Sequence, residues 1–242
     1  MKIISLFFIL LALYLLYTYI IVRQKINISK DLVQKTVKYE NLTDDKSKTL
    51  LTLGDSTAVG VGVSKREDSI PALLSNKLKV TYTENKSVSG AKVFDLKEQL
   101  QNIKLNNYDY ILIMVGGNDI VARNDVNKVG AELGDLIQAL PKDSKVIVQM
   151  CSDVGVATLL PWFARDYYTS SSLKYHTMFE KITKENGAVY INLYENPKTD
   201  PFLKSPEVYL AKDGFHPSSA GYKLWFIKLE KVIDHELFNS IK

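Results

Sequence analysis

The sequence contains little cysteine and little histidine. Its 242 residues include one cysteine, Cys151, and three histidines. A single cysteine excludes a disulfide within the chain and a metal cluster built on cysteines. It leaves the cellular compartment open, because exported proteins need not contain disulfides.

A strong charge of one sign is also missing. Lysine and arginine total 31 and aspartate and glutamate total 27, for a formal net charge of +4. The lysines are scattered along the chain, which indicates a solvated surface and argues against a nucleic-acid partner. A phosphate-binding loop is not indicated either, because Gly54, Gly60 and Gly62 fit neither the dinucleotide nor the P-loop spacing. We therefore expect no nucleotide, cofactor or metal.

A long uncharged run, by contrast, is present at the N-terminus. Residues 3–22, "IISLFFILLALYLLYTYIIV", carry no charge and have about the 20-residue length of a membrane-spanning helix. The apolar part of a cleaved signal is shorter, about 7–15 residues, and ends in small residues. Here the end is bulky, with Tyr17, Tyr19 and Val22. We therefore predict an uncleaved anchor in residues 1–25, in preference to a cleaved signal or a buried helix.

The charges that flank this segment give two answers about its orientation. Arg23, Lys25 and Lys30 follow the apolar run, and Lys2 precedes it. The positive-inside rule then favours a cytoplasmic body. A lysine followed by an apolar run is also how export signals begin. We favour a body on the exported side, periplasmic or extracellular.

Residues 26–45 are polar and lysine-rich and are predicted to form a tether. From residue 46 to 242, apolar strands alternate with helical patterns. The strands are expected at 48–54, 80–85, 108–117, 144–151 and 188–194, and the main helices at 69–79, 93–103, 125–140, 167–186 and 218–239. This alternation predicts a parallel sheet covered on both faces, that is, a three-layer α/β/α domain. Ligands of such sheets bind beyond the carboxyl ends of the strands.

Residues suited to acyl transfer follow the predicted strands. Ser56, Gly90 and Asn118 come after the first three, and "DGFHP" with Asp213 and His216 precedes the closing helix. A serine hydroxyl needs a base to become a nucleophile, and histidine suits that role near neutral pH. A carboxylate holds the histidine, and fixed N–H donors hold the oxyanion. The candidates are Ser56, His216 and Asp213, with oxyanion donors at Ser56, Gly90 and Asn118.

The other histidines have less suitable surroundings. His176 lies in a predicted helix beside Tyr175, and His235 lies near the end of the last helix between two acids. Both are expected to be structural or solvent-facing. Asp55, directly before Ser56, is expected to anchor the turn through local backbone bonds.

The four blocks resemble those of the SGNH hydrolases, also called the GDSL esterase/lipase family. "LGDSTAVGVG", "SVSGAK", "VGGND" and "DGFHPSSAGY" match in order, and the resemblance extends from about Lys48 to the C-terminus. It implies a flavodoxin-like sheet of five parallel strands, no metal, and hydrolysis of esters or thioesters through an acyl-serine. The first block departs from the family name, since Thr57 follows the serine.

The substrate is less well defined. Residues 152–168 follow the fourth strand and are apolar for a loop at the edge of a site. Leu159, Leu160, Trp162 and Phe163 are expected either to line an acyl groove, to touch lipid, or to pack on the domain's own core. With the predicted anchor, this favours a membrane-anchored esterase, lipase or lysophospholipase acting on lipid or other small acyl esters. The alternatives are an O-acetylesterase of envelope carbohydrates and, in another class, a catalytically silent binding or scaffold protein.

Overall fold

A five-stranded parallel sheet forms the centre of the domain, in a computed structural model that describes residues 2–238. The strands lie in the order β2-β1-β3-β4-β5. They are β1 (Thr49–Gly54), β2 (Tyr82–Asn85), β3 (Tyr110–Met114), β4 (Lys145–Gln149) and β5 (Val189–Ile191). All neighbouring strands pair in parallel, which confirms the predicted flavodoxin-like sheet.

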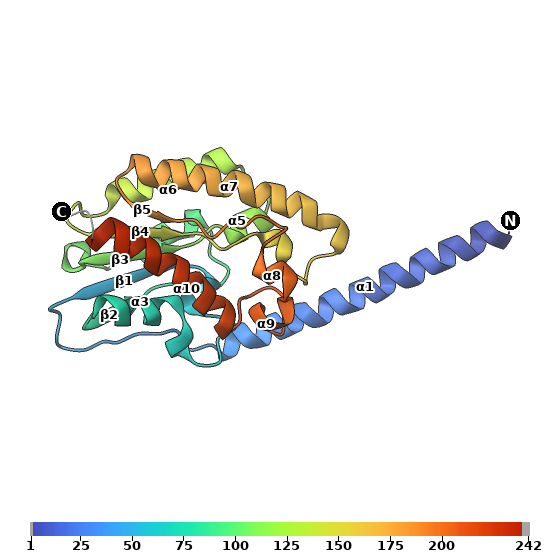
Figure 1. Ribbon diagram of the computed structural model, residues 1–242, viewed down its shortest axis with the longest axis horizontal. Helices are drawn as coiled ribbons and strands as arrows, with labels where there is room; N and C mark the ends of the chain where they lie inside the picture. The colour runs from blue at the N-terminus through green and yellow to red at the C-terminus, as the bar shows by residue number, and fades with distance from the viewer. Residues whose placement is uncertain (1, 239–242) are drawn as a thin grey trace.

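Two helical layers cover this sheet (Figure 1). Leu51 and Leu53 of β1 face a core cluster shared with α6 (Val126–Ala139) and α7 (Arg165–Glu185). Leu50 faces the opposite cluster, shared with α3 (Ile70–Leu78) and α10 (Ser219–Ile233). Alternate residues of a strand point to opposite faces, so a continuous apolar run serves both layers. Each fully buried leucine stabilises the fold by roughly 1.5–3 kcal/mol.

Short helices occupy the connections around the ends of the strands. They are α2 (Ser56–Val59), α4 (Leu96–Gln99), α5 (Gly117–Val121), α8 (Pro201–Lys204) and α9 (Pro206–Tyr209). The helix predicted over 93–103 is wrong in length: a 3₁₀ turn leads into α4, and Asn102 adopts a left-handed φ of 63°. A left-handed residue cannot continue an α-helix, so the pattern stops early. The closing helix changes to π-helical geometry over 234–238, and its predicted end, Asn239, lies outside the described residues.

Helix α1 (Lys2–Lys35) projects from the domain (Figure 1). Within residues 2–238 it alone is long and apolar enough to cross a membrane, and an 18-residue window of Leu6–Lys35 has a mean hydropathy of 2.2 with no buried share. A signal sequence near an N-terminus has the same character. The structure therefore supplies the predicted apolar helix, as an anchor or as a signal.

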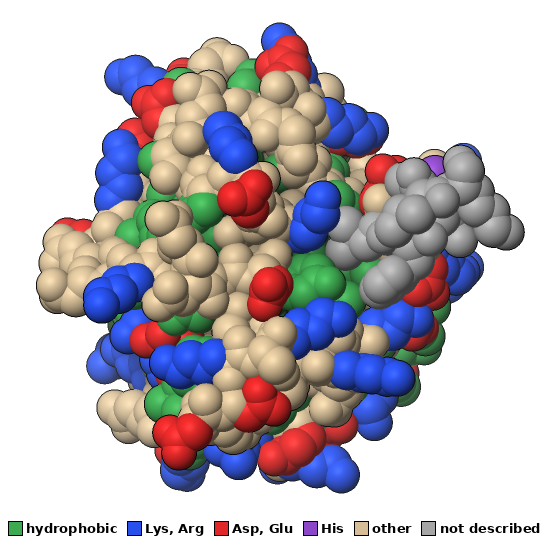
Figure 2. All heavy atoms as spheres, turned by 90° about the vertical axis from the view of Figure 1, so that its left-hand side faces the viewer, with side chains coloured by type: hydrophobic (Ala, Val, Ile, Leu, Met, Phe, Trp, Pro, Cys, Tyr) green, Lys and Arg blue, Asp and Glu red, His purple; other side chains and the backbone are tan. Residues whose placement is uncertain are grey.

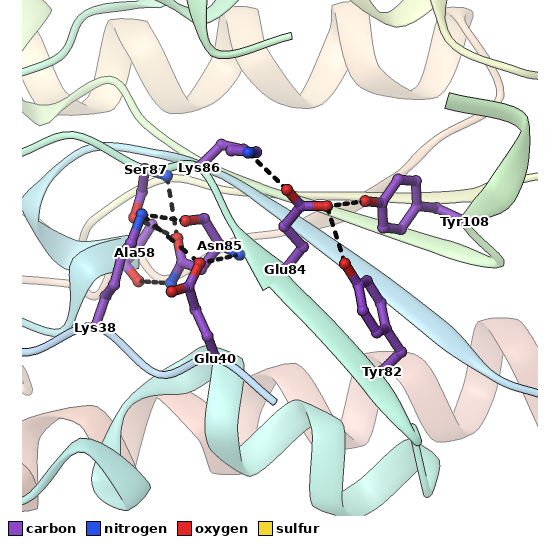
Figure 3. A network of polar contacts seen from close by, with 9 residues as sticks. All are labelled: Lys38, Glu40, Ala58, Tyr82, Glu84, Asn85, Lys86, Ser87 and Tyr108. Carbon is purple, nitrogen blue, oxygen red and sulfur yellow. Dashed lines mark hydrogen bonds and ion pairs between the residues drawn. The ribbon is translucent and has the colours of Figure 1, made fainter. Parts of the chain in front are cut away.

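The range predicted as a tether, 26–45, begins as helix and then packs against the sheet. Helix α1 extends through the first half of that range, to Lys35. Asn41 then forms an antiparallel bridge with Thr83 of the edge strand β2. Figure 3 shows Lys38 donating to the Asn85 carbonyl and Glu40 accepting from the Asn85 N–H at 3.2 Å. An edge strand offers unpaired backbone groups, which this segment occupies.

The carboxyl ends of the strands face the side of the domain from which α1 projects. In Figure 1 the segment after α1 returns along the lower edge to the left side, where β1 begins, so the carboxyl ends of the strands face the side from which α1 projects. Figure 2 shows the opposite end of the domain, where basic and acidic side chains are interspersed. The carboxyl ends of the strands, where the site is expected, therefore lie at the end of the domain nearest α1.

Candidate active site

Ser56 stands on a sharp turn between β1 and α2. The Asp55 N–H donates to the Met114 carbonyl at 2.9 Å, which holds the turn against β3. A Cβ at Gly54 would lie 2.0 Å from that same carbonyl oxygen, and the φ of Gly54 is 144°, so this position requires glycine. The close approach of β1 to β3 therefore brings Ser56 to the rim of the sheet.

Asp55 caps the short helix that Ser56 begins. Its Oδ1 accepts from the Thr57 N–H at 2.8 Å and from the Thr57 hydroxyl at 2.7 Å. Burial raises the pKa of Asp55 to about 6, against the lowering effect of those bonds. Asp55 is thus the N-cap of α2, in line with the anchoring role expected for it. Thr57, the departure from the family name, supplies two of the donors to this cap.

His216 links Ser56 to Asp213. Its Nε2 lies 2.9 Å from the Ser56 Oγ, and its Nδ1 lies 2.5 Å from the Asp213 Oδ2. All three side chains are buried, with 6% or less exposed. The Nδ1–H donates to the carboxylate, so the lone pair of Nε2 faces the serine and the hydroxyl donates to it. This is the arrangement in which a histidine can accept a proton from a serine.

The turn that carries Asp213 is held by its own carboxylate. The second oxygen, Oδ1, accepts from the Phe215 N–H at 3.0 Å and from the His216 N–H at 3.1 Å. Burial by itself raises the pKa of Asp213, but the bonds from His216 and Phe215 outweigh it and hold the pKa below its usual value. Asp213 is therefore ionised near neutral pH and can stabilise a positive charge on His216.

Gly62 permits close packing behind His216. Its φ is 101°, and a Cβ there would lie 2.2 Å from the Pro217 carbonyl oxygen and 3.3 Å from the His216 Cβ. Any larger residue would displace the backbone that carries the histidine. Gly54 and Gly62 thus allow close backbone packing, one directly before Asp55 and Ser56 and the other against His216 and Pro217.

Ser56, Asn118 and His216 line one narrow cavity of about 40 Å³. A single water needs roughly 10–15 Å³ by this measure, so the enclosed part holds about three water-sized groups. Its apolar walls come from the start of the loop after β4 and from α8, α10 and the residue after α9; they include Val154, Val156, Ala157, Phe202, Leu210 and Trp225.

The predicted oxyanion donors are only partly brought together. The Asn118 amide donates to the Ala91 carbonyl at 3.0 Å, and an amide nitrogen carries a second N–H. Gly90 does not line this cavity; it lines a neighbouring open hollow with Val88 and Ser89. The structure thus places Ser56 and Asn118 at the cavity and Gly90 beside it.

None of the four apolar loop residues lines the cavity. Leu160 packs against the core, and Trp162 and Phe163 are exposed at 68% and 61%. Leu159 lies on the other side of the loop, where its N–H donates to the Gly214 carbonyl. The first half of the loop, rather than the second, lines the cavity that Ser56 also lines.

Sequence reasoning missed Phe202 and Trp225 in the cavity wall. Trp225 is a buried residue of α10, and a single apolar residue in a helix does not distinguish a cavity wall from ordinary core. Phe202 lies in α8, whose start was signalled by Asp200 and Pro201, because aspartate is a frequent cap and proline a frequent first helical residue. The Asp200 Oδ1 does accept from the Phe202 N–H, at 2.8 Å.

The two remaining histidines lie apart from the serine. His176 is buried between the Cys151 carbonyl, 3.0 Å from Nε2, and the Tyr190 hydroxyl, 2.8 Å from Nδ1. Burial lowers its pKa to about 4. His235 is exposed and lies 3.2 Å from Glu236. Over residues 2–238, no group of three or more histidine, cysteine, aspartate and glutamate side chains is placed to hold a metal.

Comparison with known sequences gives the same assignment as the motifs. The sequence profile of the GDSL-like lipase/acylhydrolase family matches residues 52–224. A GDSL-like esterase of Mycobacterium tuberculosis is 28% identical over 185 residues, which are 72% of this chain and 58% of the relative. The chain thus spans little more than half the length of that curated relative.

Solved structures support the fold. A lipase from Streptomyces rimosus superposes with a TM-score of 0.56 at 19% identity, over 77% of this chain and all of the lipase. An acetyl-xylooligosaccharide esterase from Geobacillus superposes with a TM-score of 0.58, also at 19% identity, over 84% of this chain and 98% of the esterase. At such identities the likeness establishes a shared architecture.

Proposed function

Because the chain belongs to the GDSL-like lipase/acylhydrolase family of carboxylic ester hydrolases, we propose that it cleaves acyl esters through an acyl intermediate on Ser56. The observation that carries this proposal is the continuous hydrogen-bonded chain from the Ser56 Oγ through His216 to Asp213. A serine activated in this way is the nucleophile of acyl transfer. A silent scaffold would have no need for a buried, ionised carboxylate behind that histidine.

In the first half of the proposed reaction, the Ser56 Oγ attacks the acyl carbon and its proton passes to the His216 Nε2. The carbonyl oxygen becomes an oxyanion, which accepts from the Ser56 N–H and the free Asn118 amide N–H, with the Gly90 N–H completing the set. The imidazolium, stabilised by Asp213, then protonates the leaving alcohol oxygen. The C–O bond of the ester breaks, and the acyl group stays on Ser56.

In the second half, a water gives one proton to His216 and attacks the acyl carbon. The tetrahedral intermediate collapses, the bond to the Ser56 Oγ breaks, and the serine takes the proton back from His216. The acid leaves and the resting site is restored. No other group is required for this balance.

The proposal includes an anchor and a catalytic domain. Helix α1 has the length and apolar character of a membrane anchor, which supports attachment to a bilayer. The catalytic unit is the domain over 46–242, together with the segment at 38–41 that packs on its edge. We place this domain on the exported side. Esters held in the membrane, such as lysophospholipids, are the substrates favoured by the anchor.

A second candidate activity is supported by the size of the cavity. About 40 Å³ admits a short acyl group such as acetyl and leaves no enclosed room for a long chain. Removal of acetyl groups from envelope carbohydrates meets that limit. A screen of p-nitrophenyl esters from acetyl to palmitoyl, extended to lysophospholipid and acetylated sugar, separates the two activities by acyl length and by alcohol.

Ser56→Ala tests the shared mechanism. We expect a loss of about 10³-fold or more in kcat/KM for p-nitrophenyl acetate, because the nucleophile is removed. Ser170→Ala, at an exposed serine of α7, is the matched control and should retain activity. A fluorophosphonate should label the wild-type chain and the control but leave Ser56→Ala unlabelled. Undiminished hydrolysis by a folded Ser56→Ala variant would refute the assignment.

A further inference from the structure

We propose that the loop at residues 158–163 inserts beside α1 into the membrane leaflet nearest the domain, so that the cavity opens toward the bilayer and receives its ester from there. This inference rests on the proposed function, since it assumes that α1 lies in a membrane and that the cavity hydrolyses esters. The partner is a lipid bilayer. We call residues 158–163 the membrane loop.

The membrane loop runs along α1 and forms hydrogen bonds with it at two positions. The Lys25 Nζ donates to the Thr158 carbonyl at 2.7 Å and to the Thr158 hydroxyl at 2.9 Å. Further toward the N-terminus, the Trp162 Nε1 donates to the Tyr14 hydroxyl at 2.8 Å. Tyr14 and Lys25 are separated by about 16 Å along a helix that rises 1.5 Å per residue. Tyr14 lies inside the uncharged stretch, so the tip of the loop lies at the depth of that stretch.

The tip carries two large apolar side chains that the protein covers only in part. Trp162 and Phe163 are more than half exposed, and their rings touch edge to face at 6.0 Å. Hydrocarbon tolerates such rings when their polar atoms already have partners. The indole N–H of Trp162 is bonded to Tyr14, so insertion leaves no donor of this ring unsatisfied. The pair therefore suits lipid better than water.

The base of the same loop leads into the active site. Val156 and Ala157, directly before Thr158, line the cavity beside Ser56. The Leu159 N–H donates at 3.0 Å to the carbonyl of Gly214, which follows Asp213. The cavity, the loop and α1 consequently share one end of the domain, the end from which α1 projects (Figure 1). A bilayer around α1 would face the cavity.

Basic side chains lie around the part of α1 that contacts the domain. Lys25 and Lys212 line a shared surface hollow with Glu207, and Arg165 follows the loop closely enough to repel Lys25. Asp213 attracts Lys25 as well, so three cations face two acids there, and the remaining positive charge matches a surface of anionic lipid headgroups. The far end of the domain, by contrast, has both signs interspersed and no such helix (Figure 2).

Tryptophan fluorescence tests the insertion, because the chain has only two tryptophans and the second, Trp225, is buried. Trp225→Phe leaves Trp162 as the reporter, and Trp162→Phe leaves Trp225. Both full-length variants are reconstituted in vesicles of phosphatidylcholine and phosphatidylglycerol, with or without bromine on the phosphatidylcholine acyl chains. We expect bromine to quench Trp162 and to spare Trp225. Emission of Trp162 that bromolipid leaves unchanged and aqueous iodide quenches would overturn the proposal.

Activity provides a second measurement. In the Trp162→Ser, Phe163→Ser variant, hydrolysis of a fluorogenic ester embedded in the vesicles should fall about tenfold or more, since removal of the two rings proposed to enter the lipid weakens membrane insertion of the loop by more than about 1.4 kcal/mol. Hydrolysis of soluble p-nitrophenyl acetate should not change. Leu173→Ser, Ile227→Ser removes two exposed apolar side chains elsewhere and should affect neither substrate.

The two proposals fail in distinguishable ways. Equal hydrolysis of the embedded ester by both double variants would overturn the membrane loop and leave the serine mechanism intact. A wild-type chain that cleaves no ester, soluble or embedded, would refute the proposed function, whereas the bromolipid quenching of Trp162 would still report on the loop by itself.

Discussion

His216 and His176 are both buried in the domain, and both ring nitrogens of each are hydrogen-bonded. Their surroundings differ in two respects. His216 lies between a hydroxyl and a carboxylate and borders a cavity. His176 lies between a backbone carbonyl and a phenol, inside packed core. Burial alone is therefore common to a reactive and a structural histidine.

The difference lies in which charge state the partners favour. Asp213 is held ionised and lies 2.5 Å from His216, so it stabilises an imidazolium. Around His176 no carboxylate takes that place, and burial lowers its pKa to about 4, so the ring stays neutral. A general base must be able to hold a proton for part of the cycle, which only the His216 site allows. The His176 site instead ties β5 to the loop after β4.

The same substitution at both histidines should give the largest contrast. His216→Gln removes the base, and kcat/KM for p-nitrophenyl acetate should fall by about 10³–10⁴-fold or more. His176→Gln retains a donor for the Cys151 carbonyl and an acceptor for Tyr190, so kcat/KM should stay within about threefold of wild type. Steady-state kinetics on both variants, with circular dichroism to verify folding, measures the contrast. Equal losses in two folded variants would remove the distinction between the two sites.

Substitution of the residue hydrogen-bonded to each histidine should also lower kcat at the His216 site and spare it at the His176 site, with a smaller loss than substitution of His216 itself. Asp213→Asn keeps the shape of the turn but removes the charge that stabilises the imidazolium, and we expect kcat to fall by about 10²–10⁴-fold. Tyr190→Phe removes one neutral hydrogen bond, which should cost about 1 kcal/mol of stability and leave kcat unchanged. Stopped assays and chemical denaturation give the two quantities. An Asp213→Asn enzyme with full kcat would show that His216 needs no charged partner.

The stability of the fold in acid should depend on His176. The pKa of His176 is about 4 in the folded chain, below the ordinary 6.5, so the unfolded chain binds more protons between these values. The free energy of unfolding should then decrease as the pH falls from about 6.5 to about 4, by on the order of 2–3 kcal/mol from this residue. Asp55 has a raised pKa of about 6, so the folded chain binds its proton more tightly than the unfolded chain does. Its contribution to the free energy of unfolding therefore increases as the pH falls from about 6 to about 4, opposite to that of His176.

The comparison that isolates His176 is therefore between wild type and His176→Gln, since both contain Asp55. Urea denaturation at several pH values between 4 and 7 should show the acid loss in wild type and a weaker loss in the variant. Parallel curves for the two proteins would mean that His176 is not held neutral by its surroundings.

Several features were predictable from local sequence. The five predicted strands are runs of six to ten residues, and their alternation with helices has one common solution, a parallel sheet with two covering layers. Asp213 and His216 are three residues apart, so one turn brings the carboxylate to the ring. Ser56 follows a buried strand directly. These features depend on residues that are close together in the sequence and do not require contacts with distant segments.

The remaining features needed contacts between distant segments. The Ser56–His216 bond joins residues 160 apart, and the Trp162–Tyr14 bond joins residues 148 apart. The cavity wall takes Phe202 and Trp225 from different helices, so neither sequence neighbourhood indicates the site. The helix predicted over 93–103 is wrong in length because the backbone conformation there depends on the folded surroundings. The pairing of Asn41 with the sheet edge depends on such contacts as well.

Sequence by itself therefore determined the class of fold, the nucleophile, base and acid to test, and the presence of a long apolar helix, because each depends on residue type and short spacing. Tertiary structure alone decided which residues wall the cavity, that Gly90 lies beside it, that residues 38–41 complete the sheet edge, and that Trp162 lies along α1. Packing brings together side chains whose separation in the chain carries no signal of their contact.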